Sequence, residues 1–208
     1  MIKRYWVTIV RLAFSLLILV AIGVQLNERL DVPGFRPANF FSFFTIQSNV
    51  LAAAMLLYSA ARAARPDALP RRDILRGAVT LYLLITGIVY GVLLSGYQDA
   101  LQTTIPWVDT VLHRIIPLVI VADWLLDPPV ARLRWRFVRW WLAYPVAYVV
   151  YSLIRGPIVD WYPYPFLDPG ESGGYLRVAL YCAGITTGVV FATLLLVWNT
   201  QRRVPEST

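Results

Sequence analysis

Six long apolar stretches alternate with short polar segments along the chain. The stretches cover residues 5–26, 41–61, 74–96, 110–126, 137–154 and 176–198. Each comes close to the roughly 20 residues that an α-helix needs to cross a bilayer core of about 30 Å. Because lipid cannot hydrogen-bond an open backbone, we expect every stretch to be helical. The pattern predicts an all-α fold in which residues 1–208 form one integral membrane bundle of six transmembrane helices.

The composition supports this prediction. Hydrophobic residues make up 58% of the chain and charged residues only 15%, whereas a soluble domain carries about 25% charged residues. The first stretch follows two basic residues, as a signal peptide would, but Arg11 interrupts it and it continues past the small residues at 21–23. We therefore expect a retained first helix and not a cleaved signal peptide.

Positive side chains are divided unequally between the two sides of the predicted membrane. One side holds thirteen of them: Lys3, Arg4, Arg62, Arg65, Arg71, Arg72, Arg76, Arg132, Arg134, Arg136, Arg139, Arg202 and Arg203. The other side holds four: Arg29, Arg36, Arg155 and Arg177. The asymmetry predicts that both termini are cytoplasmic. Short arginine-rich loops beside spans favour membrane lipid phosphates as partners, and we expect no nucleic-acid binding.

The rarest residue types limit the chemistry. One cysteine, Cys182, and one histidine, His113, allow no internal disulfide and no Cys-rich or His-rich metal site. We therefore expect neither a metal nor a redox cofactor. Arginine outnumbers lysine eighteen to one and alanine is frequent, a composition that favours a GC-rich bacterial genome. The predicted location is accordingly a bacterial inner membrane.

His113 lies inside the fourth apolar stretch, where an ionisable side chain is costly and by default marks a functional site. Asp109 precedes it by four residues, close enough to accept from a ring N–H and orient the imidazole. Pro117 cannot donate a hydrogen bond to the carbonyl of residue 113, so the helix is expected to be weakened at the histidine.

The second stretch carries its own polar group, formed by Thr45, Gln47 and Asn49. Thr45 and His113 each lie four residues inside the outer end of their predicted spans, a matched depth of about 6 Å. A threonine hydroxyl beside a neutral imidazole is a usable nucleophile. Asn49 or Gln47 could then donate to a developing oxyanion, with Asp109 behind the histidine.

Polarity alone leaves two other interpretations open. The same residues could form a polar binding or transport site, or they could be interhelical hydrogen bonds in a purely structural bundle. Tyr90 is expected to make such an interhelical bond, and Asp123 and Asp127 are expected to pair with Arg132 or Arg134 near the inner end of the fourth span.

Three short motifs follow one another along the chain. The first is Asn-Phe-Phe-Ser-Phe-Phe-Thr-Ile-Gln-Ser-Asn at residues 39–49, and the second is His113 with Pro117 four residues later. The third is Trp-Tyr-Pro-Tyr-Pro-Phe-Leu at residues 161–167. In this order and spacing, the motifs resemble those of the androgen-induced protein family of multi-pass membrane proteins, and especially its bacterial six-helix relatives.

The resemblance implies an activity. Animal members of that family are threonine hydrolases that cleave fatty acid esters of hydroxy fatty acids, and their essential threonine and histidine fall here on Thr45 and His113. The sequence after Thr45 is more polar than in the animal proteins, so the resemblance does not specify the substrate. The tyrosine-proline turn is expected mainly to cap the bundle, although Tyr164 could donate to a substrate carbonyl or carboxylate. The predicted function is an intramembrane lipid-ester hydrolase.

Overall fold

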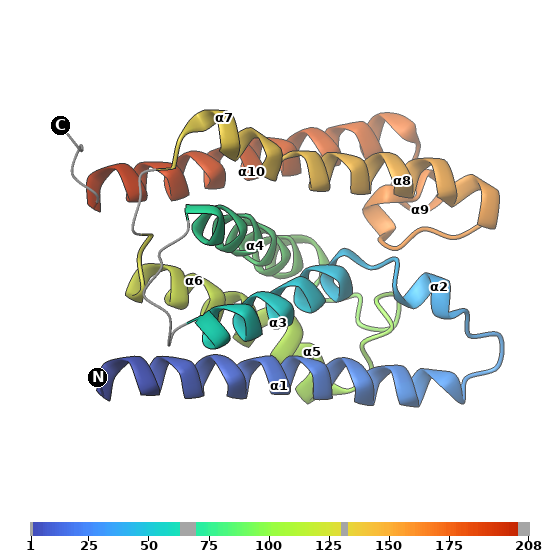
Figure 1. Ribbon diagram of the computed structural model, residues 1–208. Helices are drawn as coiled ribbons and strands as arrows, with labels where there is room; N and C mark the ends of the chain where they lie inside the picture. Colours follow the sequence, from blue (N-terminus) through green and yellow to red (C-terminus); the bar gives the residue numbers. More distant parts are fainter. Residues whose placement is uncertain (1, 63–69, 130–132, 204–208) are drawn as a thin grey trace.

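The computed structural model describes residues 2–62, 70–129 and 133–203. It is all-helical, with 81% helix and no strand in those ranges. The longer helices are α1 (Ile2–Leu30), α3 (Phe44–Arg62), α4 (Pro70–Val89), α6 (Ile116–Leu126), α8 (Ala143–Val159) and α10 (Tyr175–Arg203) (Figure 1). Shorter elements join them: α2 (Pro37–Phe40), α5 (Pro106–Thr110), α7 (Trp135–Val138), α9 (Pro169–Ser172), the π-helical turns η1 (Tyr90–Leu94) and η2 (Val111–Ile115), and the 3-10 turns η3 (Arg139–Trp141) and η4 (Pro165–Leu167).

All six predicted apolar stretches are helical, and within the described ranges five helices are long and apolar enough to cross a membrane. These five are Tyr5–Leu30, Phe44–Arg62, Asp73–Leu94, Arg139–Val159 and Tyr175–Arg202. The remaining stretch corresponds to a helical run from α5 through η2 to α6, which carries Asp109, Arg114 and Asp123. The structure thus supports a helical membrane protein with five candidate spans, and the span at 110–126 stays a prediction.

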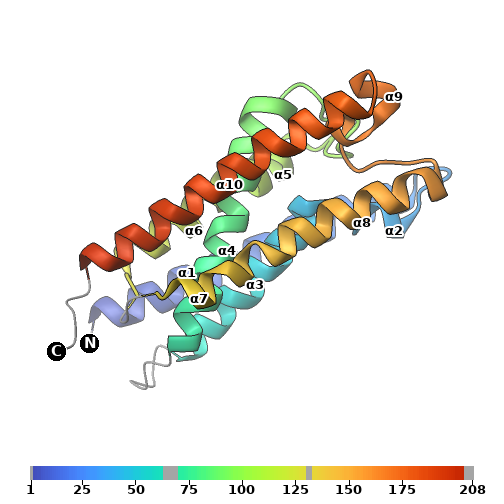
Figure 2. The same ribbon diagram turned by 90° about the horizontal axis from the view of Figure 1, so that it is seen from above.

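The bundle is arranged around α4. Helix α1 packs on α3, α3 packs on α4, and α4 also contacts α6 and α10 (Figure 1). In the candidate span Asp73–Leu94, which contains most of α4, 56% of the most apolar stretch is buried inside the bundle. The corresponding share is 17% in the candidate span Arg139–Val159, which contains α8. The start of α1 and the end of α10 lie at one end of the molecule, and α2 and α9 lie at the other. Figure 2 shows α8 and α10 diverging toward the end that carries α9.

Two glycines on α4 allow large neighbours to approach its backbone. The rings of Trp141 and Trp124 lie against Gly77, where an added Cβ would come within 2.2 Å of Trp141. An added Cβ on Gly87 would come within 3.0 Å of the Cβ of Pro117. The second contact draws α4 close to the segment that begins at His113.

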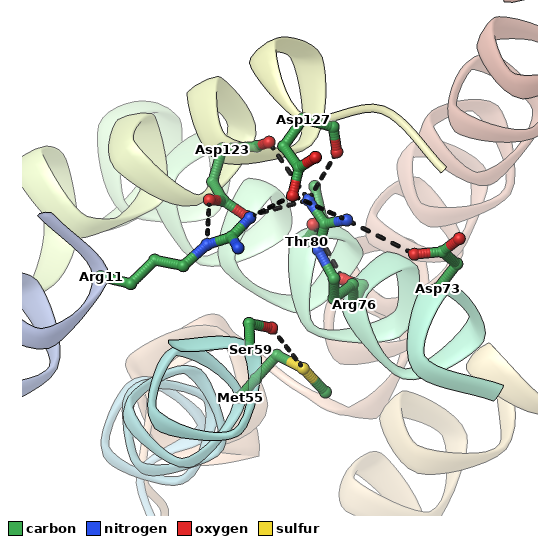
Figure 3. A network of polar contacts seen from close by, with 8 residues as sticks. All are labelled: Arg11, Met55, Ser59, Asp73, Arg76, Thr80, Asp123 and Asp127. Atoms are coloured by element: carbon green, nitrogen blue, oxygen red, sulfur yellow. Dashed lines mark hydrogen bonds and ion pairs between the residues drawn. The ribbon is translucent and has the colours of Figure 1, made fainter. Parts of the chain in front are cut away.

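A network of buried ion pairs joins α1, α4 and α6 (Figure 3). The guanidinium of Arg11 donates to Asp123 at 2.7 Å and to Asp127 at 2.5 Å. Arg76 lies 3.0 Å from the Asp123 carboxylate and 3.4 Å from that of Asp73, and it also donates to the backbone oxygen of Asp127. We refer to these five residues as the ion-pair network.

The network differs from the sequence-based expectation in two respects. Asp123 and Asp127 pair with Arg11 and Arg76, on distant helices, and not with the expected Arg134 nearby in sequence. Arg76, counted among the positive residues on the cytoplasmic side of the predicted membrane, lies within α4 and is only 3% exposed. Arg132, the other partner expected for these aspartates, lies outside the described residues, and so does Arg65, which was counted only in the charge asymmetry.

Candidate functional site

His113 lies in the π-helical turn η2, directly before the helix that contains Pro117. Its Nδ1 is 3.0 Å from a carboxylate oxygen of Asp109 and 3.2 Å from the backbone oxygen of the same residue. The predicted contact between Asp109 and the histidine is therefore present. A proton held on Nδ1 leaves Nε2 as the basic nitrogen of a neutral ring.

Tyr90 completes the surroundings of the imidazole. Its ring stacks on that of His113, with centroids 4.2 Å apart and an interplanar angle of 18°. Its hydroxyl donates to the second carboxylate oxygen of Asp109. The guanidinium carbon of Arg114 lies 5.7 Å from the centre of the Tyr90 ring, in a cation–π arrangement. The interhelical bond expected of Tyr90 exists, but its acceptor is the carboxylate behind the histidine.

Thr45 is the second residue of α3, where backbone N–H groups have no acceptor within the helix. Its N–H donates to the hydroxyl of Tyr164 at 3.3 Å, and the N–H of Phe44 donates to the hydroxyl of Tyr148 at 3.2 Å. Two tyrosines from other parts of the chain therefore cap the start of α3 at the candidate nucleophile.

The structure brings Thr45 and His113 to one small polar cavity. Its volume is about 10 Å³; its polar lining comes from Gln25, Thr45, Thr103, His113 and Tyr164, and the rest of its wall is apolar, formed by Phe43, Ile46, Leu101 and Leu112. A polar space of this size has room for about one water molecule. The helices of the two residues are neighbours, because Asn49 on α3 donates to the backbone oxygen of Leu112 at 3.2 Å. The expected meeting of the two polar patches thus occurs in the structure.

A larger, apolar pocket begins on the other side of Thr45. It has a volume of about 260 Å³ and lies between α4, α8, α10 and the turn η4, with Thr45 and Tyr164 again in its wall. Its outer rim includes Val146 and Val150 of α8 and Val190 of α10, which are 55%, 51% and 41% exposed. The pocket therefore opens sideways, on the lateral surface of the bundle, where α8 and α10 diverge.

The two amides expected near an oxyanion are engaged elsewhere. Both N–H groups of Asn49 are used by backbone oxygens, those of Thr45 and Leu112, although its Oδ1 has no hydrogen-bond partner in the described chain. Gln47 donates to the backbone oxygen of Phe41 and accepts from Tyr144 on α8, and it lines neither cavity. Their oxyanion roles stay predictions: Asn49 has no spare N–H, and Gln47 keeps one but lines neither cavity.

Tyr164 is better placed to donate. It is 5% exposed and lines both cavities beside Thr45. Burial raises the pKa of its phenol, so the hydroxyl stays protonated and can act as a donor at neutral pH. The turn that carries it was expected mainly as a cap, and the structure adds a contact with the candidate nucleophile.

Sequence reasoning did not single out Gln25 or Thr103, both of which line the polar cavity. Gln25 is a polar amide in an otherwise apolar part of the first stretch, and it is only 2% exposed. A buried polar group inside a predicted span is a signal for a functional site, and that signal was available. Thr103 lies in the loop between η1 and α5, and nothing in the sequence indicates that this loop folds inward.

Comparison with known proteins gives no relative for the chain: no family model, curated protein or solved structure matches it. The resemblance to the androgen-induced protein family therefore stays a prediction that rests on three short motifs. What can be argued about function comes from the arrangement of the residues themselves.

Proposed function

We propose that the chain is a membrane-embedded hydrolase of lipid esters, acting on fatty acid esters of hydroxy fatty acids or similar amphipathic esters. The observation that carries the proposal is the position of Thr45 at the junction of two cavities. On one side it shares a polar cavity with His113, and on the other it ends an apolar pocket that opens sideways. Such a junction suits an acyl chain whose carbonyl must meet a hydroxyl and a base.

In the proposed first step, Oγ1 of Thr45 attacks the ester carbonyl while His113 takes its proton on Nε2. The carboxylate of Asp109 holds the ring in the required tautomer and stabilises the imidazolium, and the stacked ring of Tyr90 adds to this. The Tyr164 hydroxyl stabilises the oxyanion. When the C–O bond to the leaving alcohol breaks, His113 returns the proton to the alcohol oxygen, and an acyl-threonine ester remains.

The membrane supplies the substrate in this proposal. The acyl chain enters the apolar pocket directly from the bilayer, between α8 and α10. It then lies against a wall made almost entirely of apolar side chains. The six-span topology with both termini cytoplasmic belongs to the same proposal, and it puts the site near the outer leaflet of a bacterial inner membrane. Arginine-rich inner loops would then contact lipid phosphates.

The proposal is tested with a fluorophosphonate probe and a fatty-acyl ester on the purified protein in detergent or nanodiscs. Wild type and Thr45→Ser should be labelled, whereas Thr45→Ala and His113→Ala should not. Turnover should fall about 10²–10⁴-fold in His113→Ala, the range for loss of a general base, and at least as far in Thr45→Ala. Thr187→Ala is the matched control, because Thr187 lies exposed on α10 and bonds only its own helix.

Two outcomes would contradict the proposal in different ways. Labelling that survives Thr45→Ala would remove Thr45 as the nucleophile. A folded wild type that binds fatty acid but shows neither labelling nor turnover would favour a membrane binding or transport protein with a polar site at the same residues.

A further inference from the structure

Gln25 is an unusual residue for the interior of a membrane helix, and only one of its two polar side-chain atoms has a hydrogen-bond partner in the described residues. Its Nε2 donates to the backbone oxygen of Gln102 at 2.6 Å. Because only an amide N–H can donate to a carbonyl, this bond fixes which side-chain atom is the oxygen. That oxygen, Oε1, is buried and has no hydrogen-bond partner within the described residues. An unpaired buried acceptor is costly unless something supplies a donor.

The donor belongs in the polar cavity, which Gln25 lines together with Thr45 and His113. A water molecule has two hydrogens to donate, and two of the lining residues carry an acceptor for them: Gln25, through Oε1, and His113, through Nε2 of the neutral ring. With both hydrogens engaged, a lone pair of the water oxygen is left for a third direction. Thr45, the site of the acyl group in the proposed reaction, lies in the wall of the same cavity, together with Thr103 and Tyr164.

We infer that this cavity is the chamber for the hydrolytic water and that Gln25 is its positioning residue, an inference that rests on the proposed hydrolase function. In the second half-reaction the water oxygen forms a bond to the acyl carbonyl carbon. One water proton passes to Nε2 of His113, while the other stays on oxygen, bonded to Gln25. The C–Oγ1 bond to Thr45 then breaks, His113 returns its proton to Oγ1, and the fatty acid leaves through the apolar pocket.

The loop between η1 and α5 closes this chamber. Gln102 has a φ of +57°, a left-handed backbone that a non-glycine residue adopts at a cost, and its carbonyl is held by Gln25. Leu101 and Thr103 on either side line the cavity, and the Thr103 hydroxyl donates to the backbone oxygen of Gln98 in the same loop. Water and acyl chain therefore occupy separate spaces, with Thr45 and Tyr164 between them.

The first test separates the two half-reactions, using the p-nitrophenyl ester of a medium-chain fatty acid and rapid mixing. In Gln25→Met the burst of p-nitrophenol should keep its wild-type rate, whereas steady-state turnover should fall about tenfold to hundredfold, the effect of losing one hydrogen bond in the transition state. Gln25→Glu keeps an acceptor oxygen and should recover part of the turnover. Gln201→Met, the same change at an exposed position of α10, should behave as wild type.

The second test uses the size of the chamber. A space of about 10 Å³ holds water but not methanol, so wild type in dilute methanol should release only free fatty acid. Gln25→Ala enlarges the chamber and should also release the methyl ester, which mass spectrometry detects. Methyl ester from wild type, or a Gln25→Met variant whose burst and turnover fall equally or not at all, would overturn the inference. Absence of any wild-type turnover would instead reject the proposed function.

Discussion

The ion-pair network and the Thr45–His113 site lie at opposite ends of the helical run from α5 to α6, and both pair a carboxylate with a basic side chain. In the network, Arg11 and Arg76 are each bonded to at least two acidic residues. At the site, Asp109 meets a histidine whose second ring nitrogen faces away from it. In the network, the charged groups of the arginines and aspartates bond to one another. At the site, Nε2 of His113 and Oε1 of Gln25 are left as acceptors for other molecules.

Cavities mark the same difference. The polar cavity and the apolar pocket both reach Thr45, but neither is lined by any member of the ion-pair network. Gln25 and Asn49, near the site, each have a buried oxygen with no hydrogen-bond partner in the described residues, whereas no member of the ion-pair network has one. A buried charge inside a membrane bundle is thus no sufficient sign of chemistry, since a group that is fully paired and away from any cavity serves to join helices.

The largest expected effect comes from breaking the network. Arg76→Met removes a buried guanidinium that now pairs with both Asp73 and Asp123. Loss of one member of a buried ion pair lowers the free energy of unfolding by about 3–5 kcal/mol. The midpoint of thermal unfolding in detergent should fall by about 10 °C. Turnover per folded molecule at low temperature should remain close to wild type, because Arg76 touches neither cavity.

Arg202→Met is the control for this variant, because Arg202 is exposed on α10 and contacts only the ring of Trp198 in a cation–π arrangement, a contact worth about 0.5–1 kcal/mol. If Arg76→Met fails to fold, Arg76→Lys keeps the charge without the forked geometry and should give an intermediate midpoint. Unchanged stability in Arg76→Met, or turnover that falls at full folding, would remove the distinction between the two regions.

The next effect belongs to the site. Tyr164→Phe keeps the ring, which stacks on Phe166 with centroids 5.2 Å apart, and removes only the hydroxyl that contacts Thr45. Loss of one oxyanion donor costs about 10²–10³-fold in kcat, with little change in KM. Burial raises the pKa of Tyr164 above its ordinary value of about 10. Wild-type activity should therefore show no loss from ionisation of this donor at neutral or mildly alkaline pH.

Tyr181→Phe is the matched control, because Tyr181 lies against Phe166 at 6.0 Å and lines neither cavity. It should keep wild-type kcat and stability. If Tyr164→Phe raises KM and leaves kcat unchanged, the hydroxyl binds substrate and does not stabilise the oxyanion.

Sequence periodicity and apolar length were enough to predict every long helix, because a helix buried in lipid has to satisfy its own backbone. The spacing also put Asp109 one turn before the histidine, and the structure has that contact; the matched depth of Thr45 and His113 in the membrane stays a prediction. These predictions depend on positions within one helix, where the spacing of residues fixes the geometry.

Contacts between helices could not be predicted in the same way. Arg11 was interpreted as an interruption of an apolar stretch, but its meaning lies in Asp123 and Asp127, more than one hundred residues away. Tyr164 reaches Thr45 only because a loop folds back over the bundle. An apolar helix surface carries little information on its neighbour, so the partners of a polar residue emerge only from the packed structure.

The smallest effect is expected beside the nucleophile itself. Ser48 lies one turn from Thr45, is fully buried, and bonds the backbone oxygen of Thr45 and the hydroxyl of Thr86 at 3.2 and 3.1 Å. Thr86 keeps a second bond, to the backbone oxygen of Tyr82, so Ser48→Ala leaves no unpaired group on that residue. Hydrogen bonds of this kind between membrane helices average about 0.6 kcal/mol, and the unfolding midpoint should fall by only about 2 °C.

Turnover of Ser48→Ala should equal that of wild type, measured with the same ester as for Tyr164→Phe. Ser48 and Tyr164 both contact Thr45, but Ser48 borders neither cavity and Tyr164 borders both. If Ser48→Ala lost as much turnover as Tyr164→Phe, mere proximity to Thr45 would explain the result. Different outcomes for the two variants would instead show that access to a cavity separates chemical from structural polar residues in this bundle.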